Sequence, residues 1–127
     1  MSRVVMVTGG NRGIGLACAR AFAADSHRVA VTCRGEAPGE LADAGILAVP
    51  CDVTDSTAVE AAFASIEEDL GPVEVLVANA GITRDTTFKR MEPSQWLEVI
   101  NTNLNSMFNV TRLVIDKMLE QEFGRVI

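Results

Sequence analysis

A glycine-rich segment near the N-terminus constrains this chain more than any other feature. Residues 8–15 read Thr-Gly-Gly-Asn-Arg-Gly-Ile-Gly, and they follow an apolar run over 4–7 that has the β-branched content of a buried parallel strand. Apolar residues then recur at helical spacing, at Ile14, Ala17, Cys18, Ala21 and Phe22. A strand that turns through glycines into a helix directs free N–H groups and the positive end of the helix dipole at one point. The segment therefore predicts an anion-binding loop, and a dinucleotide pyrophosphate is the favoured ligand.

Glycines at these positions have two interpretations other than dinucleotide binding. Their spacing, at Gly9, Gly13 and Gly15, is G-x-x-x-G-x-G rather than G-x-G-x-x-G, and glycines alone can also mark a plain tight turn. The strand–loop–helix context favours ligand binding over such a turn. A P-loop is disfavoured because no Gly-Lys-Ser/Thr follows to hold the β- and γ-phosphates and Mg²⁺.

Two arginines favour NADP(H) over NAD(H). In dinucleotide folds an acidic residue near the end of the second strand binds the ribose 2′-hydroxyl. Here the second strand is expected over 29–32, position 34 is Arg34, and the first carboxylate after it is Glu36. A guanidinium binds a 2′-phosphate that a carboxylate would repel, and Arg12 lies within the glycine loop. Either arginine alone could equally be a solvated loop charge.

Length and composition limit the class of protein. A chain of 127 residues is at most one domain, and 48% apolar residues with 5% aromatics suit a parallel sheet covered by small-residue helices. No apolar run approaches the roughly eighteen residues of a membrane span, and no signal peptide precedes the first strand, so we expect a cytoplasmic location. A net charge of −6 disfavours nucleic acid as a partner.

The cysteines and the single histidine give no sign of a metal or a catalytic thiol. Cys18, Cys33 and Cys51 lack metal-ligand or C-x-x-C spacing and lie in or beside apolar runs, so buried thiols are predicted. His27 stands in a polar turn before a strand, where a surface residue is expected.

Beyond the glycine loop, short apolar runs alternate with helical patterns, which predicts βαβ units and a parallel α/β sheet. Strands are expected over 4–7, 29–32, 46–49 and 73–77, with the start of a fifth at 125–127. One helical turn is expected over 40–44. A longer helix is expected from a cap at Thr54 or Asp55 to Leu70, where Gly71-Pro72 ends it.

The longest helical pattern is expected to begin at an N-cap, Ser94, and to reach Glu122, with Gly124 ending it. Its packing stripe is expected at Leu104, Met107, Phe108, Thr111, Ile115 and Met118. Four asparagines within it are unusual because the amide competes with the helix backbone; they are Asn101, Asn103, Asn105 and Asn109.

These motifs, in this order, resemble the short-chain dehydrogenase/reductase family along the whole chain. Thr8–Gly15 is similar to its T-G-x-x-x-G-x-G loop, and Asp52-Val53 to its adenine-binding pair after the third strand. Asn79-Ala80-Gly81 is similar to the N-A-G that ends its fourth strand, and Asn103 to the asparagine of its catalytic tetrad. The resemblance implies a Rossmann-like, doubly wound parallel sheet that stops at the start of the fifth strand. Residues 1–127 would then be the N-terminal, cofactor-binding half of a single domain.

The resemblance also implies roles for individual residues. The cofactor-binding set would be Thr8, Gly9, Asn11, Arg12, Gly13, Ile14, Gly15, Arg34, Asp52, Val53, Asn79, Ala80 and Gly81. Asp52 would accept from the adenine amino group while the Val53 N–H donates to a ring nitrogen, although a strand-end turn aspartate is an alternative. Asn79 could instead tie neighbouring strands. Asn103 would distort its helix and hold a water that relays protons toward a catalytic lysine. Ala78 departs from the Asn-Asn-Ala-Gly of many relatives.

Within the family, Asn79–Asp85 and Lys89-Arg90-Met91 are most similar to bacterial, actinobacterial-type 3-oxoacyl-[acyl-carrier-protein] reductases. This implies NADPH-dependent reduction of 3-oxoacyl thioesters, on acyl-carrier protein or CoA, in fatty acid biosynthesis, by a homodimer or homotetramer. Glu120-Gln121-Glu122 stands where relatives that dock acyl-carrier protein often carry basic residues. The alternatives are a short-chain reductase of another ketone and a non-catalytic NADP-binding fragment.

The chain contains no tyrosine. In the family the proton donor is the tyrosine of a Tyr-x-x-x-Lys motif, with a serine upstream, and all three lie beyond the fifth strand. We therefore expect residues 1–127 to be the N-terminal half of a longer reductase and to be inactive alone.

Overall fold

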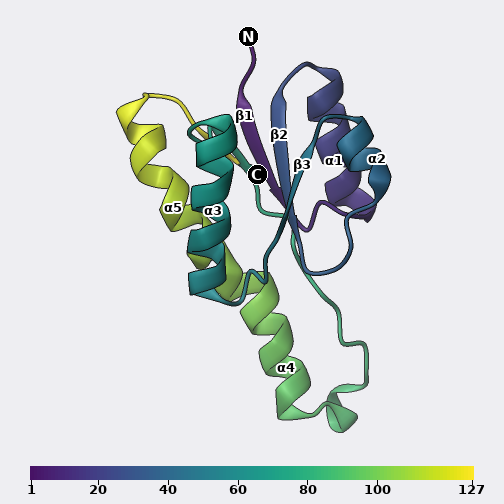
Figure 1. Ribbon diagram of the computed structural model, residues 1–127. Coiled ribbons are helices and arrows are strands. Elements are labelled where there is room, and N and C mark those ends of the chain that lie inside the picture. Colours follow the sequence, from purple (N-terminus) through teal and green to yellow (C-terminus); the bar gives the residue numbers. More distant parts are fainter.

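The computed structural model describes all 127 residues and shows a five-stranded parallel sheet between two layers of helices (Figure 1). The strands are β1 (Val4–Thr8), β2 (Arg28–Cys33), β3 (Leu47–Pro50), β4 (Val75–Val77) and β5 (Arg125–Val126). Their order in the sheet is β3-β2-β1-β4-β5. The chain thus extends the sheet on one side of β1 and then returns to extend it on the other, which confirms the predicted doubly wound topology.

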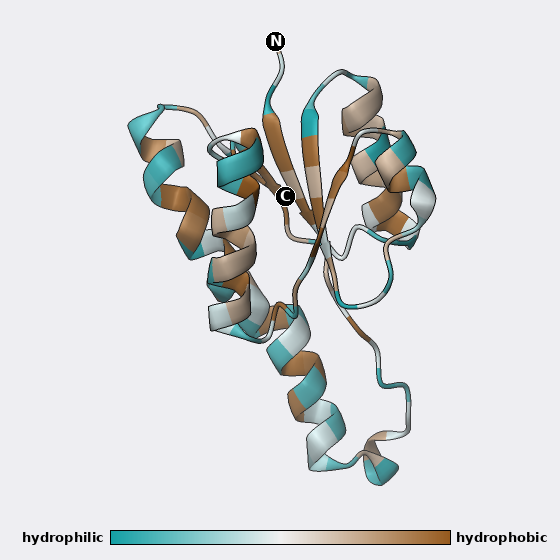
Figure 2. Ribbon diagram, viewed as in Figure 1, coloured by the Kyte–Doolittle hydropathy of each residue, from teal (hydrophilic) through white to brown (hydrophobic).

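Helices cover both faces of this sheet. The helices α1 (Gly13–Ala24) and α2 (Gly39–Asp43) lie on one face, and α3 (Ser56–Leu70) and α5 (Ser106–Glu120) lie on the other (Figure 1). Two apolar clusters result, one on each side, and the inner strands are apolar along nearly their whole length (Figure 2). This is the pattern of a parallel sheet that is buried on both faces.

Helix α3 shows how local sequence sets an element's limits. Asp55 is its N-cap, and the carboxylate accepts from the N–H groups of Thr57 and Ala58 at 3.0 and 3.2 Å. The helix ends at Gly71, whose φ of +95° lies in a region that side chains rarely adopt. Of the two predicted caps, Thr54 and Asp55, the structure selects Asp55.

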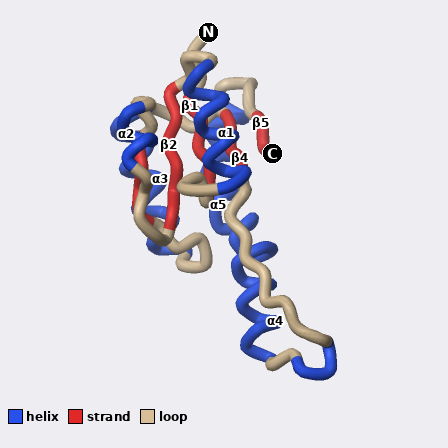
Figure 3. Tube along the Cα trace, turned by 90° about the vertical axis from the view of Figure 1, so that its right-hand side faces the viewer, coloured by secondary structure: helices blue, strands red, loops and turns tan.

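One part of the chain projects away from the sheet. It comprises the extended segment 81–92, with a 3-10 turn over Phe88–Arg90, and helix α4 (Pro93–Val99), which lies beside that segment (Figures 1 and 3). No residue of α4 is buried, and Trp96 and Leu97 are each more than half exposed. We call residues 81–99 the arm. None of the helices combines the length and the apolar composition that a membrane span requires.

The long helical region differs from the prediction in its limits. Ser94 is not the N-cap: Glu92 holds that position, its N–H donates to the Gln95 side chain at 2.8 Å, and Pro93 is the first helical residue. The helix ends at Glu120, before Glu122 and Gly124. A π-helical segment over Ile100–Asn105 separates α4 from α5.

The predicted packing stripe of this helix was also largely wrong. Leu104 and Phe108 are 61% and 71% exposed, and Ile115 is exposed as well. The residues that face the sheet are Ser106, Val110, Val114 and Met118. Because α5 carries apolar residues on two faces, its periodicity alone could not say which face packs on the sheet. The π segment also rotates every residue after it relative to an ideal α-helix.

Smaller differences concern α1 and the amino ends of the strands. Ile14 is 77% exposed rather than packed, and α1 is buried through Gly15 and Ala19. His27 is half-buried instead of lying on the surface, because its Nδ1 accepts from the Arg3 N–H at 3.0 Å. As predicted, Cys33 and Cys51 are buried, whereas Cys18 is half-buried.

Candidate cofactor site

A concave region lies where the direction of strand order reverses, at the carboxyl ends of β1 and β4. In open α/β sheets this is where ligands bind. A cleft of about 480 Å³ opens there. Its lining residues are Gly9, Asn11, Arg12, Gly13, Ile14, Thr32, Cys33, Arg34, Gly35, Cys51, Val53, Asn79, Ala80, Gly81, Ile82 and Thr102. Most of the predicted cofactor-binding residues are therefore together in one cleft.

Three of the predicted residues, Thr8, Gly15 and Asp52, do not line the cleft. Thr8 and Gly15 are buried, and Asp52 is partly exposed in the turn after β3, next to Cys51 and Val53, which line the cleft. Conversely, the sequence interpretation missed Thr32, Cys33, Gly35, Cys51, Ile82 and Thr102. The first four lie at or just after the carboxyl ends of β2 and β3, so the expected ends of these strands could have identified them. Nothing in the sequence indicated that Thr102, from the π segment, would reach this cleft.

The glycine loop presents unpaired donors to the cleft. The N-cap of α1 is Arg12, whose side chain caps no N–H, and the N–H groups of Gly13, Ile14 and Gly15 find no acceptor in the chain. Gly13 and Ile14, and with them the positive end of the α1 dipole, lie in the wall of the cleft. The arrangement suits a phosphate group, as the sequence predicted.

A tight approach to β4 explains why glycines are required in this loop. A Cβ at Gly15 would lie 2.4 Å from both Asn79 Nδ2 and the Gly9 carbonyl oxygen. Gly9 has a φ of +65°, and a Cβ there would lie 3.0 Å from the Ala80 Cα. The glycines therefore let the loop, α1 and the end of β4 meet without side chains between them.

Asn79 joins these parts. Its Nδ2 donates to the carbonyl oxygens of Thr8 and Gly9 at 3.1 and 3.2 Å, and the Ala80 N–H donates to Thr8 Oγ1 at 3.0 Å. These bonds connect the ends of β1 and β4, so the geometry shows Asn79 in the alternative role, as a tie between neighbouring strands. Thr8, 2% exposed, contributes from behind the cleft wall.

The charges around the cleft contrast with those of the whole chain. Its lining includes two arginines, Arg12 and Arg34, and no carboxylate, although the chain carries a net charge of −6. Both arginines are exposed, and neither takes part in an ion pair within the chain. The cleft is thus a local positive field suited to an anionic ligand.

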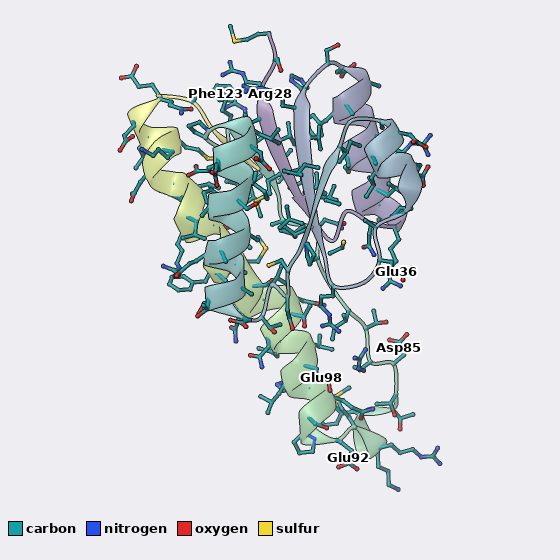
Figure 4. All side chains as sticks on the ribbon, viewed as in Figure 1. Arg28, Glu36, Asp85, Glu92, Glu98 and Phe123 are labelled. Carbon is teal, nitrogen blue, oxygen red and sulfur yellow. The ribbon has the colours of Figure 1, made fainter.

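The segment after β2 carries Arg34 and is tied back to the glycine loop. Asn11 Nδ2 donates to the Glu36 carbonyl oxygen at 3.4 Å. Figure 4 shows Glu36 on the connection that follows β2, at the opposite end of the sheet from Arg28 and Phe123. The contact brings the two arginine-bearing loops to the same edge of the cleft.

The turn after β3 is built around Asp52. Its Oδ1 accepts from the N–H and the hydroxyl of Thr54 at 2.9 and 2.7 Å. The bond from the Thr54 N–H, then the bond from the Thr54 hydroxyl, and to a smaller extent the charge of Arg34 hold the pKa of Asp52 below its usual range. The carboxylate is therefore charged at neutral pH. One carboxylate oxygen therefore shapes the turn, and the other accepts no hydrogen bond from the chain.

The two cysteines that line the cleft are buried, and burial favours the neutral thiol over the thiolate. Burial, followed by the charges of Asp52 and Asp55, raises the pKa of Cys51 to about 11. Burial also raises the pKa of Cys33. Both groups are thus neutral at physiological pH, where only the thiolate would be nucleophilic.

Asn103 lies in the π segment and binds the backbone of the arm. Its Oδ1 accepts from the Ile82 N–H at 2.8 Å, and its Nδ2 donates to the Ile82 carbonyl oxygen at 2.9 Å. A Cβ at Gly81 would lie 3.3 Å from Asn103 Oδ1, so the approach is close. The predicted distortion of the helix around Asn103 is present as this π segment.

A substitution at Gly15 tests the contact between the loop and β4. In the full-length protein, we expect Gly15→Ala to lower the free energy of unfolding by about 1–3 kcal/mol, because the new methyl group displaces Asn79 or the Gly9 carbonyl. Gly39→Ala is the matched control, since nothing lies within 4 Å of its added Cβ, and it should change stability by less than about 1 kcal/mol. Urea denaturation of both variants makes the comparison, and equal effects would contradict it.

Comparisons with known proteins agree with this geometry. The chain is 52% identical over 127 residues to the 3-oxoacyl-[acyl-carrier-protein] reductase MabA of Mycobacterium avium, covering 100% of the chain and 48% of that protein. It is 45% identical over 130 aligned residues to an acetoacetyl-CoA reductase of Shinella zoogloeoides, covering 100% of the chain and 54% of that protein. The chain thus spans about half the length of the curated relatives it matches.

A solved structure and a family assignment complete the comparison. The crystal structure of a point variant of actinorhodin polyketide ketoreductase with NADPH superimposes with a TM-score of 0.92 at 38% identity, covering 98% of this chain and 51% of that one. Residues 3–127 match the family described as short chain dehydrogenase. The fold, the glycine loop and this match show that the chain belongs to the short-chain dehydrogenase/reductase family.

Proposed function

We propose that the protein to which these residues belong reduces 3-oxoacyl thioesters to 3-hydroxyacyl thioesters with NADPH, as a step of fatty acid biosynthesis. The observation that carries the proposal is the cleft itself, where unpaired N–H groups of the glycine loop, two unpaired arginines and the Asn79–Gly81 segment meet. The substrate class is supported by relatives named for 3-oxoacyl-[acyl-carrier-protein] and acetoacetyl-CoA reduction.

The residues present fit NADP(H). The N–H groups at the start of α1 suit the pyrophosphate, and Arg12 and Arg34 suit a 2′-phosphate. In the adenine half, the Val53 N–H has no acceptor in the chain, and Asp52 keeps one carboxylate oxygen free. Thr8, Gly9, Asn79, Ala80 and Gly81 would hold the glycine loop and the nicotinamide side of the site in place. A structure with NADPH bound, at 38% identity, supports the same choice of cofactor.

When bound, NADPH supplies the hydride that reduces the ketone. The residues of this chain bind and orient the cofactor, and Asn103 is proposed to take part in proton supply by fixing the local backbone where a relay water is held. Because residues 1–127 contain no tyrosine, we propose that they bind cofactor but do not reduce ketones on their own.

Substrate class is tested with the full-length protein. We expect oxidation of NADPH, followed at 340 nm, with acetoacetyl-CoA or an acetoacetyl-acyl-carrier protein, and little with simple cyclic ketones or quinones. Residues 1–127 alone should show NADPH binding by fluorescence and no turnover. Turnover of a non-thioester ketone without turnover of either thioester would overturn the proposal and favour a different short-chain reductase.

Cofactor preference is tested at Arg34. Arg34→Asp removes a charge-assisted hydrogen bond to the 2′-phosphate and adds a carboxylate that repels it. We therefore expect kcat/KM for NADPH to fall at least about tenfold, and kcat/KM for NADH to change much less. Arg90→Asp carries the same charge change on the arm, outside the cleft, and serves as the control. A wild type that prefers NADH, or a variant with unchanged preference, would show that Arg34 does not select the cofactor.

We also propose that the protein forms a homodimer or homotetramer through α4 and α5. Six large apolar residues on these helices and the π segment are exposed: Trp96, Leu97, Leu104, Phe108, Ile115 and Leu119. An exposed apolar patch of this kind marks an interaction surface. In sedimentation experiments the full-length protein should be oligomeric, and the double variant Phe108→Asp, Ile115→Asp should have a smaller mass. A monomeric wild type, or a variant of unchanged mass, would contradict this.

A further inference from the structure

One side chain reaches the turn after β3 from a distant part of the chain. Asn109, on α5, donates from Nδ2 to the Val53 carbonyl oxygen at 2.9 Å, across 56 positions of sequence. Asn109 is partly buried, and Val53 is 4% exposed and lines the cleft. We propose that Asn109 is a positioning residue for the adenine half of the cofactor, acting through Val53. The inference rests on the proposed function, in which this turn binds adenine.

The other bonds of the turn are made within it or by the backbone of the adjacent strand. Thr54 donates twice to Asp52 Oδ1, and the Asp55 N–H donates to the Asp52 carbonyl at 3.1 Å. At its start, the Cys51 N–H donates to the Cys33 carbonyl of the adjacent strand at 3.0 Å. Asn109 is thus the only side chain from outside the turn that holds it.

The position of this bond matters. The peptide unit between Val53 and Thr54 contains the Val53 carbonyl, bound by Asn109, and the Thr54 N–H, bound by Asp52. With both of its polar groups held, this peptide cannot rotate without breaking a hydrogen bond. Its fixed plane restrains the preceding Val53 N–H, which makes no bond within the chain and is the donor proposed for adenine.

An asparagine within α5 needs an explanation that helix formation does not give. Asparagine is a poor helix former because its amide competes with the backbone. Asn103 and Asn105, in the preceding π segment, bind Ile82 and Asn101 respectively. Asn109 likewise uses its amide for a bond outside its own backbone, to Val53, and this bond links α5 to the cleft.

A separate link, between α5 and α3, provides a matched control. Arg112 Nη2 lies 2.5 Å from Glu60 Oε1, one helical turn beyond Asn109, and both side chains are more than one-third exposed. An exposed ion pair contributes little. Arg112→Met removes this link and leaves the Asn109–Val53 bond intact.

The test compares two hydride donors in the full-length protein. NADPH carries adenosine, whereas reduced nicotinamide mononucleotide lacks it. We expect Asn109→Leu, which removes the donor but keeps the same number and branching of side-chain heavy atoms, to lower kcat/KM for NADPH by about five- to tenfold, the loss of one hydrogen bond. The value for reduced nicotinamide mononucleotide should change less than about twofold, and Arg112→Met should leave both values near those of the wild type.

Amide hydrogen exchange in the cofactor-free protein gives a second readout that does not depend on the proposed function. In Asn109→Leu, we expect the Thr54 and Asp55 N–H groups to exchange faster than in the wild type. If Asn109→Leu does not fold, Asn109→Ser, which keeps a shorter donor, replaces it, and smaller changes in the same direction are expected.

The outcomes separate the two proposals. An equal loss with both hydride donors, or no loss with either, would overturn the positioning role of Asn109. If the wild type uses neither donor, the proposed function fails, and the exchange rates alone decide whether Asn109 holds the turn. Unchanged exchange at Thr54 and Asp55 would then overturn the inference.

Discussion

The amide of Asn79 fixes the geometry on which the whole cleft depends. By donating to two successive carbonyl oxygens, of Thr8 and Gly9, it binds the end of β4 to the end of β1 at the point where strand order reverses. The bond is possible only because Gly15 brings no Cβ into the same space. Two elements that are about 70 residues apart in sequence are thereby held in contact. The start of α1, with its unpaired N–H groups, takes its direction from this contact.

Uncharged amides make most of the long-range connections around this cleft. Asn79 binds β1, Asn103 binds the arm at Ile82, and Asn109 binds the turn after β3. An amide offers both a donor and an acceptor, and it adds no charge. Carboxylates in the same positions would weaken the field that the unpaired Arg12 and Arg34 create for an anionic ligand. The acidic residues of the chain are correspondingly absent from the lining of the cleft.

The sequence predicted the features whose cause is local. The glycine loop, the strand runs and the Asp55 cap each depend on residues within a few positions, so their patterns identify them. The packing face of α5 depends on tertiary contacts and on the rotation introduced by the π segment, so the apolar periodicity pointed to the wrong face. Asn109 was recognisable as unusual within a helix, but its partner, Val53, lies 56 positions away and no pattern specifies it.

Helix α5 carries apolar residues on both a buried and an exposed face, and this explains why its sequence pattern is ambiguous. Val110, Val114 and Met118 are apolar because they face the sheet, while Phe108, Ile115 and Leu119 are apolar and exposed. A helix that packed on one side only would carry charges on the second face. Between the two faces lies Asn109, which donates to the cleft turn. The position of α5 on the sheet is therefore set by its buried face, and that position determines whether Asn109 can reach Val53. Since Asn109 and the buried face belong to the same helix, the geometry of the turn after β3 depends on how α5 packs on the sheet.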